Sequence, residues 1–102
     1  MKVLHLTSEE FYALTKDPTK KVLVDFYADW CGPCRMQGPI VEEIANENTS
    51  IIVGKLNVDE YSDVAVKLGI QSIPTLLIFK DGKLANKFIG LTSKDALLKA
   101  LK

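Results

Sequence analysis

Residues 21–28 constrain the fold of this chain more than any other segment, because they read Lys-Val-Leu-Val-Asp-Phe-Tyr-Ala with little alternation of apolar and polar side chains. β-Branched and aromatic residues favour strands, and a strand without alternation is typical of one that is covered on both faces. We therefore expect a central strand of a sheet with helices on both sides. Two cysteines, Cys31 and Cys34, follow soon after its end.

Strand and helix patterns alternate along the rest of the chain. Short apolar or β-branched runs predict four further strands, over residues 3–6, 51–58, 75–79 and 84–89. Asp81-Gly82 lies between the last two runs and is a typical hairpin turn, so these two strands are expected to be antiparallel neighbours. The order β-α-β-α-β-α-β-β-α predicts an α/β fold with a mixed sheet.

Four helices are expected between and after these strands, each with its own start or stop signal. Apolar residues recur with a helical period after the cysteines, and a proline inside that stretch predicts a kink. The signals are the capping box Thr7-x-x-Glu10 for the first helix, residues 34–48 with Pro39 for the second, Asp59 as cap and Gly69 as terminator for the third, and Thr92 or Ser93 as the start of the fourth.

The composition indicates an ordinary globular chain. Its 102 residues are 47% hydrophobic and 25% charged, which fits one domain spanning residues 1–102. Thirteen basic residues balance thirteen acidic ones, so the chain lacks the footprint of nucleic-acid or anionic-membrane binding. The N-terminus has no signal-peptide core, and no run approaches the roughly 18 apolar residues of a membrane span. We expect a cytoplasmic monomer whose partners are proteins.

Cys31-Gly32-Pro33-Cys34 holds the only two cysteines of the chain. Zinc normally needs four ligands, whereas these thiols have only the remote His5 to extend the set. A structural disulfide would close a loop of about four residues, worth roughly 2 kcal/mol, and permanent disulfides are rare in a reducing cytoplasm. The motif also falls at a strand-to-helix junction, where the helix dipole favours a thiolate at Cys31. Thiol–disulfide chemistry is therefore favoured, with no metal and no bound cofactor.

Four other positions are ambiguous on the residues alone. Asp25 interrupts an apolar strand, so its carboxylate either faces solvent or is buried with a raised pKa. Trp30 is either a core residue or an exposed one beside the cysteines. Pro74, at the head of a strand, fits a simple edge position, and Lys55 fits an ordinary surface lysine.

A set of residues spread over essentially the whole chain keeps a characteristic order and spacing. These residues are Phe26-x-Ala28-x-Trp30-Cys31-Gly32-Pro33-Cys34-Arg35-Met36, Pro39, Asn57-Val58-Asp59, Pro74-Thr75-Leu76 and Asp81-Gly82. In this order and spacing they resemble the thioredoxin family. Two departures are small: Tyr27 stands where many members have a second tryptophan, and Gln37-Gly38 replaces a more apolar pair.

The resemblance implies a thioredoxin fold, with a central mixed five-stranded sheet flanked by four helices. It also implies a thiol–disulfide oxidoreductase that reduces protein disulfides and is itself recycled by a separate thioredoxin reductase. The implied roles are Cys31 as nucleophile, Cys34 as resolving thiol, Gly32 and Pro33 as the residues that shape the motif, Asp25 as a buried acid exchanging a proton with Cys34, Lys55 as its neighbour, and Trp30, Ile73, Pro74 after a cis bond, Ile89 and Gly90 as the substrate-docking surface.

Three other functions are compatible with the same pattern. A binding subunit could keep the fold while its cysteines are dispensable, and a disulfide isomerase or oxidase could use the same pair at a higher reduction potential. A zinc module is the third, and it would carry bound metal. Loss of activity on cysteine substitution separates the enzyme from the binding subunit.

Overall fold

The computed structural model describes residues 3–102 and contains one five-stranded sheet with helices on both faces. The strand order is β1-β3-β2-β4-β5. Four helices and five strands confirm the expected order and the mixed α/β architecture. The elements are β1 (Val3–His5), α1 (Ser8–Thr15), β2 (Lys21–Tyr27), α2 (Gly32–Glu47), β3 (Ile52–Asn57), α3 (Ser62–Leu68), β4 (Thr75–Lys80), β5 (Lys83–Ile89) and α4 (Lys94–Leu101).

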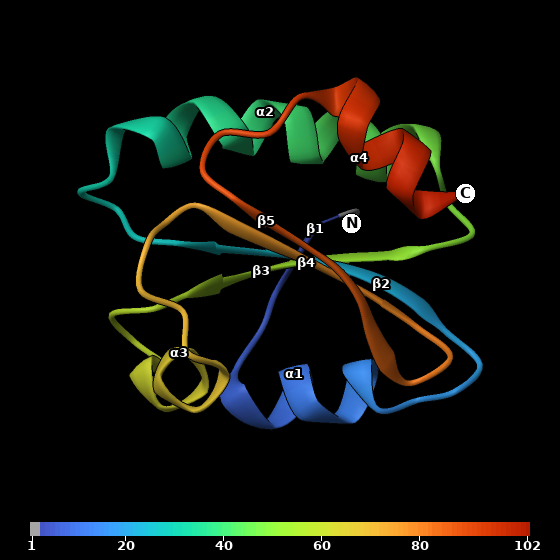
Figure 1. Cartoon of the computed structure of the whole chain (residues 1–102), viewed down its shortest axis with the longest axis horizontal. Helices are drawn as coiled ribbons and strands as arrows, with labels where there is room; N and C mark the ends of the chain where they lie inside the picture. Colours follow the sequence, from blue (N-terminus) through green and yellow to red (C-terminus); the bar gives the residue numbers. More distant parts are fainter. Residues whose placement is uncertain (1–2) are drawn as a thin grey trace.

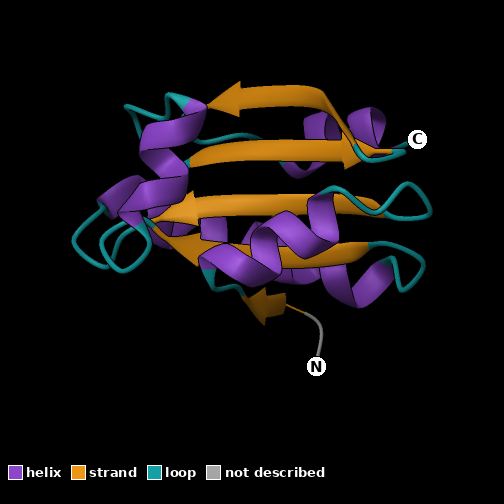
Figure 2. Ribbon diagram, turned by 90° about the horizontal axis from the view of Figure 1, so that it is seen from below, coloured by secondary structure: helices purple, strands orange, loops and turns teal. Residues whose placement is uncertain are grey.

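The sheet is parallel on one side of β2 and antiparallel on the other. β3 pairs in parallel with both β1 and β2, whereas β4 runs antiparallel to β2 and to β5. In Figure 1, α2 and α4 lie above the sheet while α1 and α3 lie below it. Figure 2 shows the strands side by side in a single layer. β2 is therefore the central strand, as its unbroken apolar run predicts.

Each face of β2 contributes to a different hydrophobic core. Leu23 packs with Val41 and Ile44 of α2, whereas Val24 packs with Phe11 of α1. Successive side chains of a strand point to opposite faces. Asp25 follows Val24 and therefore faces the same side as Leu23, toward α2. This parity places an acid beneath the helix that carries the cysteines.

Three of the predicted helix signals are confirmed and one is wrong. Thr7 forms the capping box of α1, Ser93 rather than Thr92 caps α4, and Gly69 ends α3 with a positive φ of 69°. Asp59 does not cap α3, which begins after Tyr61 without a side-chain cap. Asn57 explains the difference, because its side chain and carbonyl accept hydrogen bonds from the N–H groups of residues 59–61 and hold them in a turn.

The second helix begins at Gly32, two residues earlier than expected, because Cys31 acts as its N-cap and Pro33 lies in the first turn. The helix runs on to Glu47 with Pro39 inside it. Asp81 and Gly82 both have positive φ, which confirms the hairpin between β4 and β5. The cysteines therefore sit where the central strand ends and the longest helix starts.

Candidate active site

Cys31 and Cys34 form a disulfide at the N-terminus of α2, with their Cα atoms 5.2 Å apart. The backbone N–H of Cys34 donates a hydrogen bond of 3.2 Å to the sulfur of Cys31. Gly32 and Pro33 are exposed and complete the first turn between them. In the reduced protein this N–H and the helix dipole would stabilise negative charge on Cys31. These local contacts would favour a thiolate at Cys31 over one at Cys34.

The sulfur of Cys31 faces the loop that precedes β4. The Ile73 carbonyl oxygen lies 3.7 Å from this sulfur, and the Ile73–Pro74 peptide bond is cis, as the resemblance implies. Pro74 itself is buried, and its carbonyl accepts a hydrogen bond of 2.8 Å from the Gly90 N–H. The end of β5 is thereby joined to the cis-proline loop beside Cys31.

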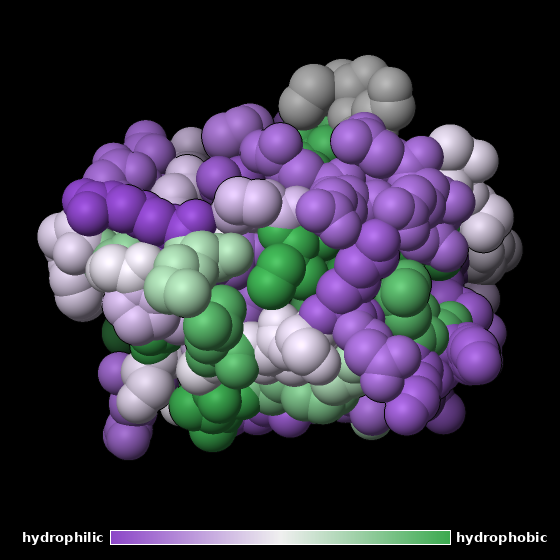
Figure 3. Space-filling view, turned by 90° about the horizontal axis from the view of Figure 1, so that it is seen from above, coloured by the Kyte–Doolittle hydropathy of each residue, from purple (hydrophilic) through white to green (hydrophobic). Residues whose placement is uncertain are grey.

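Two large apolar side chains near this loop are exposed to solvent. Trp30 is 68% exposed, and its indole Nε1 donates a hydrogen bond of 2.9 Å to Asp59, which excludes core packing for this residue. Ile89 is 66% exposed at the end of β5, opposite Thr75 in the register. Figure 3, which looks onto α2 and α4, shows apolar side chains gathered at the lower left of this face. Exposed apolar patches of this kind mark binding surfaces.

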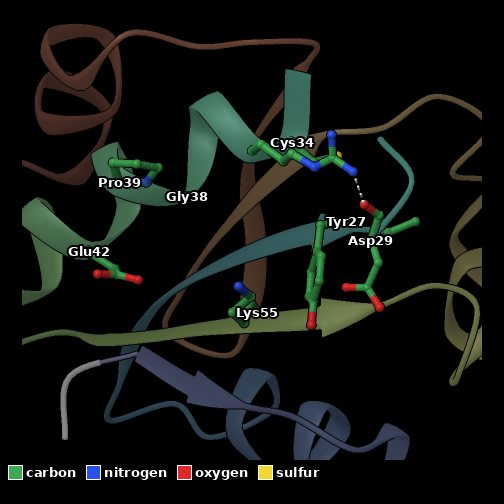
Figure 4. A pocket seen from close by; sticks show the side chains of 9 residues that line it. Tyr27, Asp29, Cys34, Gly38, Pro39, Glu42 and Lys55 are labelled. Atoms are coloured by element: carbon green, nitrogen blue, oxygen red, sulfur yellow. Dashed lines mark hydrogen bonds between the residues drawn. The ribbon is translucent and has the colours of Figure 1, made fainter. Parts of the chain in front are cut away.

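Cys34 has different surroundings from Cys31. It lines a pocket of about 330 Å³ on the other side of the motif, together with Tyr27, Ala28, Asp29, Arg35, Gly38, Pro39, Glu42 and Lys55. Figure 4 shows the Glu42 carboxylate beneath Pro39 and Gly38, with the Lys55 ammonium farther along the pocket toward Tyr27. The Arg35 guanidinium donates a hydrogen bond of 3.0 Å to the Asp29 carbonyl. Both cysteines are buried in one apolar cluster with Ala28, and the charged pocket lies on the Cys34 side of that cluster.

Asp25 is buried, with only 2% of its surface exposed. Among residues 3–102, its Oδ1 atom has no hydrogen-bond partner. Burial raises the pKa of this carboxyl from 3.8 to about 7, and the nearby Lys55 charge lowers it in part. Asp25 and Lys55 are direct partners in the β2–β3 register. The structure thus favours the buried alternative for Asp25.

Lys55 is half-buried and lies apart from the docking residues, on the pocket side of Cys34. Its Nζ atom is 4.3 Å from the centroid of the Tyr27 ring, a cation–π contact. Burial is the main cause that raises the pKa of the Tyr27 hydroxyl, with nearby carboxylates adding to it. The Tyr27 hydroxyl thus stays neutral, and the Tyr27 ring packs against the Lys55 ammonium.

The sequence interpretation missed Gln37, which is completely buried in α2. Both polar groups of its amide bond to the backbone of Thr92, at 2.8 and 3.0 Å. The signal was present in the spacing, because Gln37 lies on the same buried stripe of α2 as Cys34, Val41 and Ile44. A polar side chain on a buried stripe needs hydrogen-bond partners.

Two other features bear on possible partners: clusters of metal-ligating side chains, and helices long enough to cross a membrane. In the part of the chain from residue 3 onward, no cluster of three or more His, Cys, Asp or Glu side chains could hold a metal ion. None of the helices described for these residues is long and apolar enough to cross a membrane.

Comparison with known proteins places the chain among thioredoxins. The sequence model of the thioredoxin family matches residues 2–102. A thioredoxin from Chlamydia caviae is 45% identical over 83 residues, or 81% of each chain. A thioredoxin from Chlorobaculum thiosulfatiphilum is 43% identical over 101 residues, covering 98% of this chain and 94% of that protein.

Solved structures agree with these relatives. A mutant thioredoxin from Halobacterium salinarum superposes with a TM-score of 0.88 at 40% identity, over 98% of this chain and 88% of that one. Mitochondrial thioredoxin 3 from Saccharomyces cerevisiae, in its oxidised form, gives 0.86 at 36% identity, over 97% and 92%. Since these likenesses span nearly the whole chain, and Cys31 and Cys34 of this chain form a disulfide at the start of α2, the chain belongs to the thioredoxin family of thiol–disulfide oxidoreductases, which reduce protein disulfides.

Proposed function

We propose that the two cysteines act in a fixed order, in which Cys31 attacks the substrate and Cys34 resolves the intermediate. The observation that carries this proposal is the contrast between their surroundings. The Cys31 sulfur lies beside the Ile73 carbonyl and the apolar surface, whereas Cys34 lines the charged pocket with Lys55. The exposed apolar side chains Trp30 and Ile89 give a protein substrate a place to dock on the Cys31 side, and the acid buried beneath α2 would take the proton of Cys34.

The reaction then proceeds in two balanced exchanges. The Cys31 thiolate attacks one sulfur of the substrate disulfide, so that a Cys31–substrate bond forms and the other substrate sulfur leaves as a thiolate and takes up a proton. Cys34, as a thiolate, next attacks the Cys31 sulfur, which forms the Cys31–Cys34 disulfide and releases the second substrate thiolate. The substrate gains two electrons, and the protein loses them.

Asp25 is the proposed acceptor of the Cys34 proton. It faces α2 from the central strand and has a pKa of about 7, so that near neutral pH it is part carboxylate and part acid. A base with a pKa near the working pH combines availability with proton affinity. Resolution should therefore depend on pH with a midpoint set by Asp25.

Lys55→Met is expected to move that midpoint to higher pH. The Lys55 charge lowers the pKa of Asp25, so its removal raises this pKa and leaves less carboxylate at pH 7. Resolution should slow at pH 7 and recover in more alkaline solution. The measurement is the rate of release of the second substrate thiol across a pH series. Lys83→Met, at an exposed position in β5, is the matched control. An unshifted midpoint in the Lys55 variant would show that Lys55 does not set the pKa of Asp25.

The proposed substrate is an extended segment of a protein that contains a disulfide. The backbone of Ile73, next to Cys31, would pair with this segment by β-augmentation. Trp30, Ile89 and Gly90 with Pro74 would flank it as an apolar docking surface. Main-chain hydrogen bonds would then provide the affinity, so that substrate segments of many different sequences could bind.

Ile89→Ser is expected to raise the KM for insulin disulfide reduction by about threefold, through loss of apolar contact area. The rate with a small aromatic disulfide should not change, because such a substrate does not need the docking surface. Leu84→Ser is a stringent control, since Leu84 is also an exposed apolar residue of β5, at the other end of the strand. Equal KM values for the two variants would remove Ile89 from the docking surface.

We place this activity in the reducing cytoplasm, with a separate thioredoxin reductase returning the Cys31–Cys34 disulfide to the dithiol. The family supports disulfide-containing proteins and a reductase as partners in general. The chain is proposed to act as a monomer. This setting matches a cysteine pair that must be reduced before each turnover.

A further inference from the structure

The buried amide of Gln37 connects the cysteine helix to the loop that follows β5. Its Nε2 group donates a hydrogen bond of 3.0 Å to the Thr92 carbonyl, and its Oε1 atom accepts one of 2.8 Å from the Thr92 N–H. Gln37 is fully buried and Thr92 is only 8% exposed. A primary amide matches the N–H and C=O of one residue in the way a neighbouring strand would. The side chain therefore holds both the position and the orientation of Thr92.

The contacts continue from Thr92 back to the reactive sulfur. The Thr92 hydroxyl donates a hydrogen bond of 2.9 Å to the Gly90 carbonyl, and the Gly90 N–H donates to the Pro74 carbonyl at 2.8 Å. Ile73, next to Pro74, has its carbonyl 3.7 Å from the Cys31 sulfur. Figure 1 shows the loop after β5 passing alongside α2 before α4 begins. Hydrogen bonds thus join α2 to residues 90–92 and these residues to the cis-proline loop, and the contact between the Ile73 carbonyl and the Cys31 sulfur closes this ring of contacts around the site.

We infer that Gln37 is a positioning residue for substrate binding, which fixes residues 89–92 relative to Cys31. The inference rests on the proposed docking surface, because it names the contact that holds part of that surface in place. It also adds Leu91, which is 48% exposed between Gly90 and Thr92, to the apolar groups presented to a substrate. A protein substrate that meets α2, the cis-proline loop and residues 89–92 together requires these segments in one fixed arrangement.

An apolar residue in place of Gln37 would fill the same space in the core, but it would no longer hold residues 90–92 in position relative to α2. The Thr92 N–H and carbonyl would then lie in the interior without partners, and the loop would shift to hydrate them. The sulfurs would stay where the N-terminus of α2 holds them, because Gln37 makes none of the contacts at Cys31 or Cys34 described above. Binding of large substrates should therefore weaken while the chemistry at the cysteines persists.

The test compares Gln37→Met, which has a similar volume, with Thr92→Val, which removes the hydroxyl bond to Gly90. Pre-reduced proteins are mixed with insulin at increasing concentration, and with a small aromatic disulfide. We expect about a fivefold rise in KM for insulin with kcat changed less than about twofold, and unchanged rates with the small disulfide. The reduction potential against glutathione should match that of the unmodified protein.

Thr15→Val is the matched control for a merely structural role. Thr15 is also buried, and its hydroxyl donates a hydrogen bond of 2.8 Å to the Phe11 carbonyl in α1, on the opposite face of the sheet. This variant should lose thermal stability without a change in KM. If Thr15→Val raises KM as much as Gln37→Met does, the positioning role is wrong and stability alone explains the effect.

Two other results would overturn the inference. An unchanged KM in Gln37→Met, or a shifted potential with an unchanged KM, would show that the amide does not act on docking. If Gln37→Met does not fold, Thr92→Val decides in the same way. Ile89→Ser separates the positioning role from the docking surface on which it rests. A raised KM in Ile89→Ser but not in the two ring variants refutes only the positioning role, whereas an unchanged KM in all three variants refutes both the positioning role and the part of the docking surface formed by residues 89–92.

Discussion

Cys31→Ser and Cys34→Ser are each expected to reduce insulin disulfides no faster than dithiothreitol alone. A serine hydroxyl is not ionised near neutral pH and cannot form a disulfide, so neither variant can complete both exchanges. The two variants fail at different steps. Cys31→Ser lacks the thiolate that attacks the substrate, whereas Cys34→Ser attacks once and then remains bound to it. The measurement is insulin precipitation with dithiothreitol as the electron source.

The stability of both variants must be compared with that of the reduced protein. The disulfide closes a loop of about four residues and is worth roughly 2 kcal/mol in the unfolded-state entropy model, so oxidised wild type is the wrong reference. Against the reduced form, the unfolding free energies should agree closely, and loss of activity then reflects chemistry. Full activity in both variants would instead support a binding subunit with dispensable cysteines.

Asp25→Asn is expected to raise the free energy of unfolding and to slow the resolution step. The pKa of Asp25 rises from 3.8 in the unfolded chain to about 7 in the folded one. The folded state therefore prefers the protonated acid, and wild type loses stability as pH rises from about 4 to about 7. A pKa that differs by one between the folded and unfolded states corresponds to about 1.4 kcal/mol, so the full loss is up to about 4 kcal/mol. Asparagine has the shape of the neutral acid and avoids this loss.

Urea unfolding of the oxidised proteins at two pH values checks the sign. At pH 8 the variant should exceed wild type by up to about 4 kcal/mol, and at pH 3 the two should be nearly equal. Asp95→Asn is the control, because Asp95 is exposed in α4 and its carboxylate pairs with Lys99 across one helical turn. A gain that is the same at both pH values would show that burial of the Asp25 charge is not its cause.

The kinetic half of the Asp25 prediction concerns resolution. Without a carboxylate facing α2, the Cys34 thiol must lose its proton to water, so release of the second substrate thiol should slow at neutral pH. Attack by Cys31 should keep its rate, because its thiolate is stabilised by the helix N-terminus. Stopped-flow measurement of both steps separates them, and unchanged turnover would refute the proton-transfer role.

Features set by local pattern could be predicted from the sequence. The run at residues 21–28 identified the central strand, and the positive φ values at Asp81 and Gly82 match the turn expected there. Both depend on neighbouring residues alone. Asp59 shows the limit of local patterns. Aspartate is a typical helix cap, yet Asn57 holds the Asp59 backbone in a turn, and the Trp30 indole donates a hydrogen bond to the Asp59 carboxylate.

The candidate site depends on contacts that the sequence does not contain. On the residues alone Asp25 fitted either the surface or the interior, and the sheet order, which places β2 between β3 and β4, accounts for its burial. That same order makes Lys55 its neighbour. Gln37 was predictable as a buried position, but its partner Thr92 is 55 residues away and contributes backbone rather than a recognisable side chain. Long-range pairing, rather than residue type, decides such roles.

The order of the two cysteines is tested most directly by trapping the intermediate. Reduced Cys34→Ser and Cys31→Ser proteins are each mixed with a disulfide-containing peptide, and the adduct is followed by intact-mass spectrometry and located by peptide mapping. The account predicts a rapid, stoichiometric adduct at Cys31 in the Cys34→Ser protein and a much slower one at Cys34 in the other. Equal rates of adduct formation, or faster capture by Cys34, would contradict it.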